Sequence, residues 1–129
     1  MLYGYARVST DEQDTAAQVA ALKTAGCEII ITETGSGSKR REKLDKLLKR
    51  LGHGDVLYVW KLDRLSRSLK DVLAIMEELD RQGAGFKSIT EAHFDTTSAT
   101  GALMLQIVAS FADYAKRAVM QSHWVEVAV

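Results

Sequence analysis

The sequence predicts an α/β fold, with a mostly parallel central sheet, helices on both of its faces and a long helix at the C-terminal end. Short β-branched or aromatic runs alternate with helical patterns between residues 2 and 90, which is typical of strands joined by crossover helices. A chain of 129 residues also has the usual size of one domain. After Gly101 neither glycine nor proline interrupts the chain, so the last segment can form one long helix.

Four runs rich in β-branched and aromatic residues predict the strands. The first run ends near Arg7 and Ser9, which lie two residues apart and therefore on the same side of a strand. The third run is apolar throughout, as expected for a strand that is covered on both faces. We expect strands at residues 2–8, 28–32, 56–60 and 86–90.

Helical spacing of apolar residues and suitable end residues predict the helices between these strands. Thr10 and Gln13 have the spacing of a capping box, and Gly26 ends the helix that follows. Leucines recur at helical spacing in a basic segment that Gly52 closes, and a third amphipathic pattern ends near Gly83. We expect helices at residues 13–25, 41–51 and 69–83, and a terminal helix of about 25 residues from residue 101 onward. The domain boundaries expected are 1–100 for the sheet domain and 101–129 for the long helix.

Charge is balanced overall but uneven along the chain. Seventeen basic and seventeen acidic residues give no net charge, so the molecule as a whole has no strong long-range attraction for DNA. Between residues 39 and 50, however, seven basic residues occur with only two acidic ones. This run is either a solvated helix face or a local patch that holds phosphates.

Several protein classes are poor matches to the sequence. No segment approaches the roughly 18 apolar residues that a membrane-spanning helix needs, and the N-terminus lacks the order of a signal peptide. The single cysteine, Cys27, cannot form an internal disulfide and favours a reducing compartment. We therefore expect a cytoplasmic protein without membrane contact.

Reactive side chains follow two of the predicted strands. Arg7 and Ser9 stand where the first strand ends, and Asp63, Arg64 and Arg67 follow the third. Ligands of open α/β sheets usually bind beyond the carboxyl ends of the strands, so these side chains are candidates for one site. If residues 64–67 begin a helix, Arg64 and Arg67 lie on the same face of it.

The residue types indicate phosphate-ester chemistry without a cofactor. Neither histidine nor cysteine shows the spacing of metal ligands, and no P-loop glycine pattern occurs, so we expect no metal and no cofactor. A serine without a histidine is a weak nucleophile unless its alkoxide is stabilised. Clustered guanidiniums, to which Arg41 at the start of the basic helix contributes, can stabilise it and neutralise phosphoryl oxygens. The chemistry indicated is attack on a phosphate ester through a transient phosphoserine.

Each of these residues also has a purely structural interpretation. Ser9 suits a helix N-cap, and Asp63 can pair with Arg64 or Arg67 at the surface. The two arginines can also extend their stems along an apolar surface at a helix start. Trp60 is interpreted first as a core residue.

Two segments resemble the signature blocks of the serine recombinases, the resolvase/invertase family. They are YARVSTDEQ at residues 5–13 and GDVLYVWKLDRLSRS at residues 54–68. The similarity extends over nearly the whole chain and includes GSG at residues 35–37 and DTTSATG at residues 95–101. Two separate motifs in the family's order and at the family's distance make coincidence a poor explanation.

The resemblance implies a DNA recombinase domain in which a serine attacks a phosphodiester and forms a 5′-phosphoserine link. Strand exchange and religation then need no ATP. The implied partners are a DNA recombination site and further copies of the chain, as a homodimer and as a tetramer in the active complex, with the long helix at the interfaces. The catalytic residues implied are Ser9, Arg7, Arg64, Arg67, Asp63 and Arg41, with Tyr5, Gln13 and Gln18 binding DNA or phosphate or supporting the site.

The sequence departs from the family pattern in two places. The family continues into a helix-turn-helix DNA-binding domain, which this chain does not show before Val129, and residues 112–123 lack a Glu-Arg pair usual in the long helix. We therefore expect a truncated catalytic domain. The alternative is a catalytically impaired association module of the same fold. A nucleotide- or phosphate-binding signalling domain is a third hypothesis, for which no glycine loop or acidic metal pocket is visible.

Overall fold

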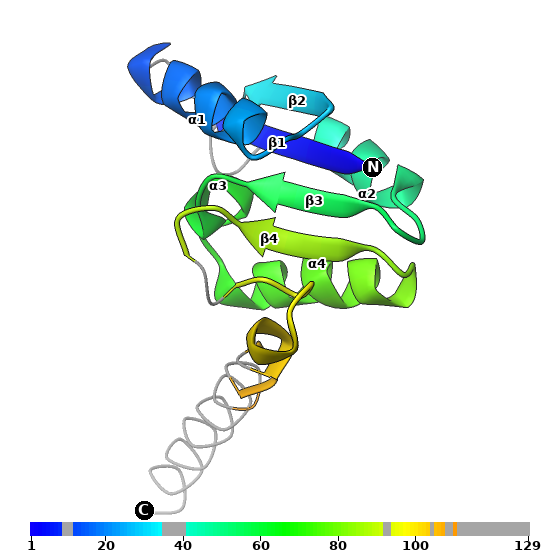
Figure 1. Ribbon diagram of the computed structural model, residues 1–129. Coiled ribbons are helices and arrows are strands. Elements are labelled where there is room, and N and C mark those ends of the chain that lie inside the picture. The colour runs from blue at the N-terminus through cyan, green and yellow to red at the C-terminus, as the bar shows by residue number, and fades with distance from the viewer. Residues whose placement is uncertain (9–11, 35–40, 92–93, 104, 108–109, 111–129) are drawn as a thin grey trace, which may run out of the picture.

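The domain is built on a four-stranded, all-parallel sheet in the order β2-β1-β3-β4 (Figure 1). The computed structural model describes residues 1–8, 12–34, 41–91, 94–103, 105–107 and 110. The strands are β1 (Leu2–Val8), β2 (Ile29–Thr34), β3 (Val56–Val59) and β4 (Gly85–Ser88). The helices are α1 (Glu12–Thr24), α2 (Glu42–Arg50), α3 (Leu62–Leu65) and α4 (Leu69–Arg81). The parallel sheet and its alternation with helices confirm the predicted α/β class.

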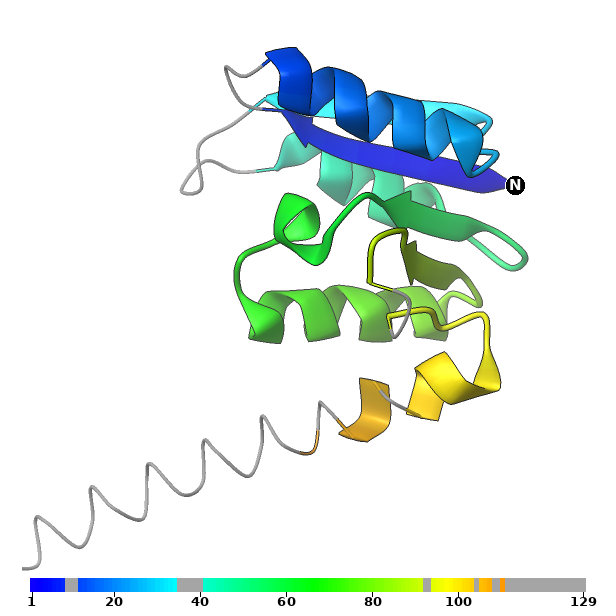
Figure 2. The ribbon, with the colours of Figure 1, turned by 60° about the vertical axis from the view of Figure 1, so that its left-hand side comes forward.

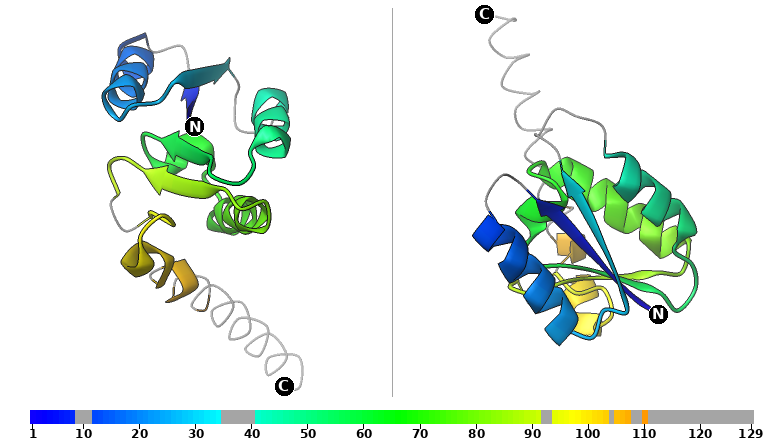
Figure 3. Two further views of the ribbon diagram at one scale, coloured as in Figure 1. Left: turned by 45° about the vertical axis from the view of Figure 1, so that its right-hand side comes forward. Right: turned by 90° about the horizontal axis from the view of Figure 1, so that it is seen from above.

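Helices cover both faces of the sheet. Seen along the sheet, α1 lies on one face, and α2 and α4 lie on the other (Figure 3). The side chains of β1 alternate accordingly: Tyr3 and Tyr5 belong to the core beneath α2 and α4, while Ala6 and Val8 face α1. Because β1 is central and contributes to both cores, its side chains are almost all buried.

The larger core lies between the sheet and the pair α2 and α4. The leucines of α2 recur at helical spacing and are buried there, as the sequence predicts. Phe86 from β4 and Tyr5 from β1 are fully buried beside them. The buried residues of the two helices are Leu44, Leu47, Leu48, Val72, Ile75, Met76 and Leu79.

The smaller core, under α1, depends on a close approach of helix and strand. A side chain at Gly4 would come within 3.1 Å of Leu22 and 3.3 Å of the Cys27 sulfur, so only glycine lets α1 lie this close to β1. Gly26 ends the helix with a backbone φ of 98°, the left-handed conformation that glycine adopts at helix ends. Burial raises the pKa of the partly buried Cys27 thiol to about 11, which keeps it protonated near neutral pH.

The observed element boundaries differ from the predicted ones by one or two residues. α1 begins at Glu12, and β2 continues to Thr34. The expectation that β3 is covered on both faces is wrong, because Leu57 and Val59 are buried whereas the alternate residues stay partly exposed. α1 lies mainly over β1 and leaves the face of β3 half covered, where the Lys87 amine lies 5.8 Å from the Tyr58 ring centre.

The segment after β4 runs back along the sheet edge before a helix begins. Asp95 forms an antiparallel bridge with Lys87, and residues 99–103 and 105–107 are helical (Figure 2). Leu105 is buried against the larger core. The rest of the predicted terminal helix lies outside the described residues. None of the described helices has the length and apolar character needed to cross a membrane.

A buried carboxylate from the end of β2 fastens the start of α2. Glu33 is only 7% exposed and accepts hydrogen bonds from the Tyr5 hydroxyl at 2.7 Å and from the Lys43 backbone N–H at 2.7 Å. Arg41, which precedes α2, makes no capping hydrogen bond with its side chain. Glu33 therefore satisfies the free N–H groups at this helix start and places its negative charge at the positive end of the helix dipole.

The Tyr5 hydroxyl should contribute measurably to stability. We expect Tyr5→Phe to lower the free energy of unfolding by about 2 kcal/mol, because a buried carboxylate loses a hydrogen-bond donor. Tyr3→Phe is the matched control: Tyr3 lies on the same strand and is buried, and its change should cost less than about 0.5 kcal/mol. Urea unfolding of both variants measures the difference, and equal losses would contradict the role given to Glu33.

Candidate functional site

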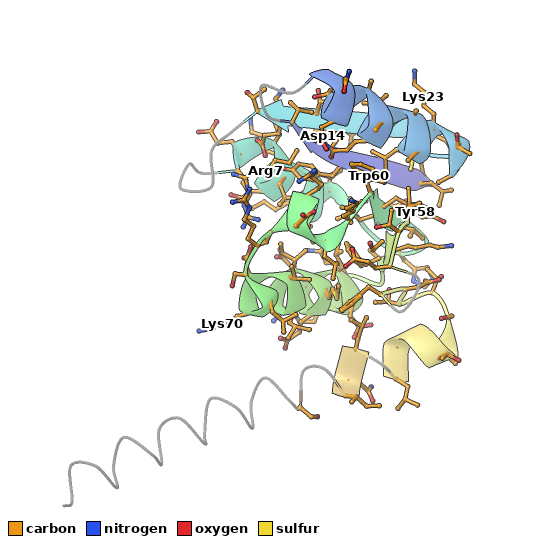
Figure 4. The ribbon with its side chains drawn as sticks, turned by 90° about the vertical axis from the view of Figure 1, so that its left-hand side faces the viewer. Arg7, Asp14, Lys23, Tyr58, Trp60 and Lys70 are labelled. Atoms are coloured by element: carbon orange, nitrogen blue, oxygen red, sulfur yellow. The ribbon has the colours of Figure 1, made fainter. Side chains whose placement is uncertain are left out.

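The strand order places a binding site at the carboxyl ends of β1 and β3. From β1 the chain continues to β2 on one side, and from β3 to β4 on the other, so the direction of winding reverses between β1 and β3. Ligands of open parallel sheets bind at such a switch point. Figure 4 looks onto this edge, where Arg7, Asp14 and Trp60 lie. The two sequence segments that carry the candidate residues thus meet at one place in the fold.

A buried glutamine joins the end of β1 to α1. Gln18 is fully buried, and its Nε2 donates to the backbone oxygen of Arg7 at 3.0 Å and to Oδ2 of Asp14 at 2.8 Å. Its Oε1 has no hydrogen-bond partner among the described residues. Gln18 therefore supports the site from beneath rather than presenting its amide to solvent.

Arg64, in α3, is held by a carboxylate from α1. Its Nη2 donates to Asp14 Oδ1 at 2.6 Å, while its Nη1 lies 3.7 Å from Asp63 Oδ2, too far for a hydrogen bond. The guanidinium carbon also lies 5.7 Å from the centre of the Trp60 ring. Trp60 is partly buried and lies between cations, since the Lys61 amine is 4.6 Å from its ring centre.

Arg64 and Arg67 do not share a helix face, because residues 64–67 do not begin a helix, which was the condition for that arrangement. α3 ends at Leu65, and Ser66 has extended backbone angles, φ −163° and ψ 151°. The chain then turns into α4, whose N-cap Ser68 accepts a hydrogen bond from the Asp71 backbone N–H. Arg67 therefore lies on the connection between the two helices, where it is exposed.

Glu91, which follows β4, fixes the start of α3. Its Oε1 accepts hydrogen bonds from the Leu62 backbone N–H at 2.7 Å and from the Ser88 hydroxyl at 3.0 Å. Ser88 is fully buried at the end of β4. A four-residue helix has little stability of its own, so this carboxylate sets the direction in which α3 presents Asp63 and Arg64.

Arg41 binds the junction of α3 and α4 with both of its terminal nitrogens. Its Nη1 donates to the Leu65 backbone oxygen and its Nη2 to Asp71 Oδ2, each at 2.6 Å. The junction carries Arg67, so Arg41 acts on the position of that residue.

The charges of Arg7 and Arg41 act on the same buried hydroxyl, that of Tyr5. Burial and then the hydrogen bond to Glu33 raise the pKa of Tyr5 well above its usual range, and the charges of Arg7 and Arg41 act in the opposite direction. Tyr5 is fully buried, which fits a supporting role and not contact with a phosphate. Gln13 is exposed on α1, and Ser9 lies outside the described residues.

The sequence reasoning missed four acidic residues that organise this edge, namely Asp14, Glu33, Asp71 and Glu91. Two of them, Asp14 and Asp71, had a local signal in the sequence. Asp14 stands four residues before Gln18 on one helix, and Asp71 has the spacing of a helix cap with Ser68. Glu33 had none, because its partners are remote in the sequence, and Glu91 is three residues from Ser88 but remote from Leu62, the residue of α3 that it binds. Within the described ranges, no group of three or more potential ligands from histidine, cysteine, aspartate and glutamate could hold a metal ion.

Arg41 should stabilise the fold through its two-point contact. We expect Arg41→Lys to lower the free energy of unfolding by about 1 kcal/mol, because a lysine amine cannot reach the Leu65 oxygen and the Asp71 carboxylate in the same planar geometry. Arg50→Lys, an exposed change in the last turn of the same helix, is the control and should have almost no effect. Urea unfolding again provides the measurement, and an effect no larger than the control's would show that the contact is dispensable.

Comparisons with known proteins identify the family of the chain. Residues 2–123 match the family model described as Resolvase, N terminal domain. The chain is 42% identical over 122 residues to the DNA-invertase of Escherichia phage P1 and 41% identical over 122 residues to the serine recombinase gin of Escherichia phage Mu. These matches cover 94% of this chain but 65% and 63% of the relatives, so the chain spans less than two thirds of their length. The crystal structure of the N-terminal catalytic domain of TP901-1 integrase superposes with a TM-score of 0.73 at 28% identity, over 90% of this chain and 96% of that one. The chain belongs to the resolvase N-terminal domain family of the serine recombinases.

Proposed function

We propose that this chain is the catalytic domain of a site-specific DNA recombinase that cuts and rejoins DNA through Ser9. One observation carries the proposal: the two motif segments, residues 5–13 and 54–68, lie side by side at the switch point of the sheet. Tyr5 pairs with Val59 there, and Asp14, directly after the first segment, forms an ion pair with Arg64. The family and the invertases and resolvases within it support the same chemistry.

The reaction is a pair of transesterifications. The Ser9 hydroxyl loses its proton, its oxygen bonds to the phosphorus of a DNA phosphodiester, and the bond from phosphorus to the 3′ oxygen breaks. The 3′ oxygen takes up a proton and leaves as a hydroxyl, so that no net proton is released. In the second step a 3′-hydroxyl attacks the phosphoserine and releases Ser9. One ester replaces another in each step, so that no nucleotide is consumed.

The arginines supply the electrostatic stabilisation that this chemistry needs. A phosphoryl group in transfer spreads negative charge over its outer oxygens, and guanidinium groups bind such oxygens in pairs. We assign this role to Arg7, Arg64 and Arg67, with Asp63 orienting them or passing a proton to the leaving oxygen. Arg41, Gln18 and Tyr5 hold these groups in place, and Gln13 stands at the exposed edge of the site.

Oligomerisation is part of the proposal and is supported by an exposed apolar pair. Leu103 and Ile107 are 57% and 43% exposed, and they stand four residues apart on the helical segment after β4. We assign this face to a homodimer that assembles into a tetramer on DNA. The same pair favours the second candidate function, a module that associates without cutting DNA, and the two candidates differ in whether a covalent adduct forms.

Ser9→Ala should abolish covalent attachment to DNA. We expect the wild-type chain, at high concentration with a library of linear duplexes of randomised core sequence, to form an adduct that survives a denaturing gel. The change removes the oxygen that forms the ester. Ser110→Ala is the control, because among the described residues the Ser110 hydroxyl donates to the Gln106 backbone oxygen and to no residue of the site.

The adduct also reports the direction of cleavage. The freed strand should be extended by a DNA polymerase, since it ends in a 3′-hydroxyl. An adduct that persists in Ser9→Ala would refute the nucleophile, and absence of any wild-type adduct would favour the association module.

Charging the exposed apolar pair should weaken self-association. We expect the double change Leu103→Lys and Ile107→Lys to raise the dimer dissociation constant at least tenfold, because burying a lysine amine without a partner is costly. Lys70→Leu, at an exposed position of α4, is a control for a change of net charge. Sedimentation equilibrium measures the constants, and an unchanged dimer would place the interface elsewhere.

A further inference from the structure

We infer that Asp14 is a positioning residue that sets the orientation of the Arg64 guanidinium towards the scissile phosphate; the inference rests on the proposed function. Asp14 itself is not assigned a contact with DNA. It acts through Arg64, which it binds across the switch point from α1. In Figure 4 Asp14 lies on the side of α1 that faces the sheet edge where Trp60 lies.

The strongest contact of Arg64 is with this one carboxylate. Among the described residues, Asp14 is its hydrogen-bond partner, at 2.6 Å, and the other carboxylate nearby, Asp63, is 54% exposed and 3.7 Å away. The Arg64 Nε is buried and has no hydrogen-bond partner in the described part of the chain. Asp14 therefore decides which edge of the guanidinium is occupied and which nitrogens are left for another acceptor.

Asp14 can impose an orientation because both of its oxygens are bound. Oδ1 accepts from Arg64, and Oδ2 accepts from the amide of Gln18 at 2.8 Å. Gln18 is fully buried and also bonds the backbone oxygen of Arg7. Two side chains, Asp14 and Gln18, thus fix the position of the Arg64 guanidinium relative to the backbone of β1 at Arg7.

The burial of the pair separates it from an ordinary surface ion pair. The Asp14 side chain is 16% exposed and that of Arg64 is 26% exposed, so solvent screens their attraction only in part. An arginine side chain otherwise samples many rotamers, and a fixed partner removes that freedom before the substrate arrives.

A carboxylate beside a phosphate site also has an opposing effect. Its negative charge weakens the attraction of the site for DNA, which makes Asp14 unfavourable for binding and useful only for orientation. Removal of this charge should therefore slow the chemical step without weakening DNA binding. If Asp14 instead competed with the phosphate for Arg64, its removal would speed the chemical step.

The test compares Asp14→Asn with the wild-type full chain on a duplex recovered from the adduct library. Asparagine has the same shape but lacks the charge, and because an amide nitrogen replaces one carboxylate oxygen, it has an acceptor at only one of the two positions that bind Arg64 and Gln18. We expect the single-turnover rate of adduct formation at saturating DNA to fall about 10- to 100-fold, while the dissociation constant for DNA stays within about threefold. Asp80→Asn, an exposed change near the far end of α4, is the matched control and should leave the rate unchanged.

A double-mutant cycle shows whether Asp14 acts through Arg64. In the background of Arg64→Lys, the change Asp14→Asn should alter the rate by less than about threefold, because the group that it orients is already gone. An equal loss in both backgrounds overturns the inference, as does an unchanged or faster rate in the single variant. Asp14→Ser, which is also uncharged, gives the same comparison if Asp14→Asn fails to fold.

An NMR measurement decides the point independently of activity. Held by Asp14, the two Nη groups of Arg64 should give separate resonances at low temperature, identified by their loss in Arg64→Lys. They should merge in Asp14→Asn, since rotation of the guanidinium is then free, and stay separate in Asp80→Asn. Identical spectra of wild type and Asp14→Asn overturn the positioning role. Merged resonances sustain it even where no wild-type adduct forms, a result that would count against the recombinase function alone.

Discussion

β1 pairs in parallel with β2 along one edge and with β3 along the other, and this double pairing determines where every functional segment lies. Parallel strands end at the same edge of a sheet, so the residues after β1 and after β3 become neighbours although they are about fifty positions apart in sequence. The connections that leave the carboxyl ends of β1 and β3 run in opposite directions, to β2 and to β4, so neither of them crosses the β1–β3 boundary at this edge. The candidate arginines occupy this place.

Carboxylates from neighbouring elements hold each part of the site. Glu33 from the end of β2 binds the start of α2, and Glu91 after β4 binds the start of α3. Asp71 holds Arg41, and Asp14 holds Arg64. A group of arginines on a small domain repels itself strongly, and these partners balance the charge while giving each side chain a direction. The zero net charge of the chain is consistent with such internal pairing.

The short helix α3 shows how the tertiary structure alters a local pattern. The spacing of Arg64 and Arg67 suits one helix face, but the backbone becomes extended at Ser66 and a new helix begins at Leu69. The break separates the two arginines into different surroundings: Arg64 is partly buried beside Trp60, and Arg67 is exposed on the connection.

The parallel sheet, the order of strands and helices and the leucine face of α2 follow from periodicity and end residues, because these features depend on neighbours within a few positions. The proximity of the segments after β1 and β3, which carry Arg7 and Arg64, could also be predicted, since the strand ends of a parallel sheet share an edge. The long-range contacts that hold the site together could not be predicted. Asp14 with Arg64, Glu33 with Tyr5 and Glu91 with Leu62 join residues 28 to 50 positions apart, and no local pattern records such a contact. These contacts form because a buried or half-buried charge needs an opposite charge or a hydrogen-bond partner. Only the packing of α1 and α3 on the sheet determines which partner is within reach.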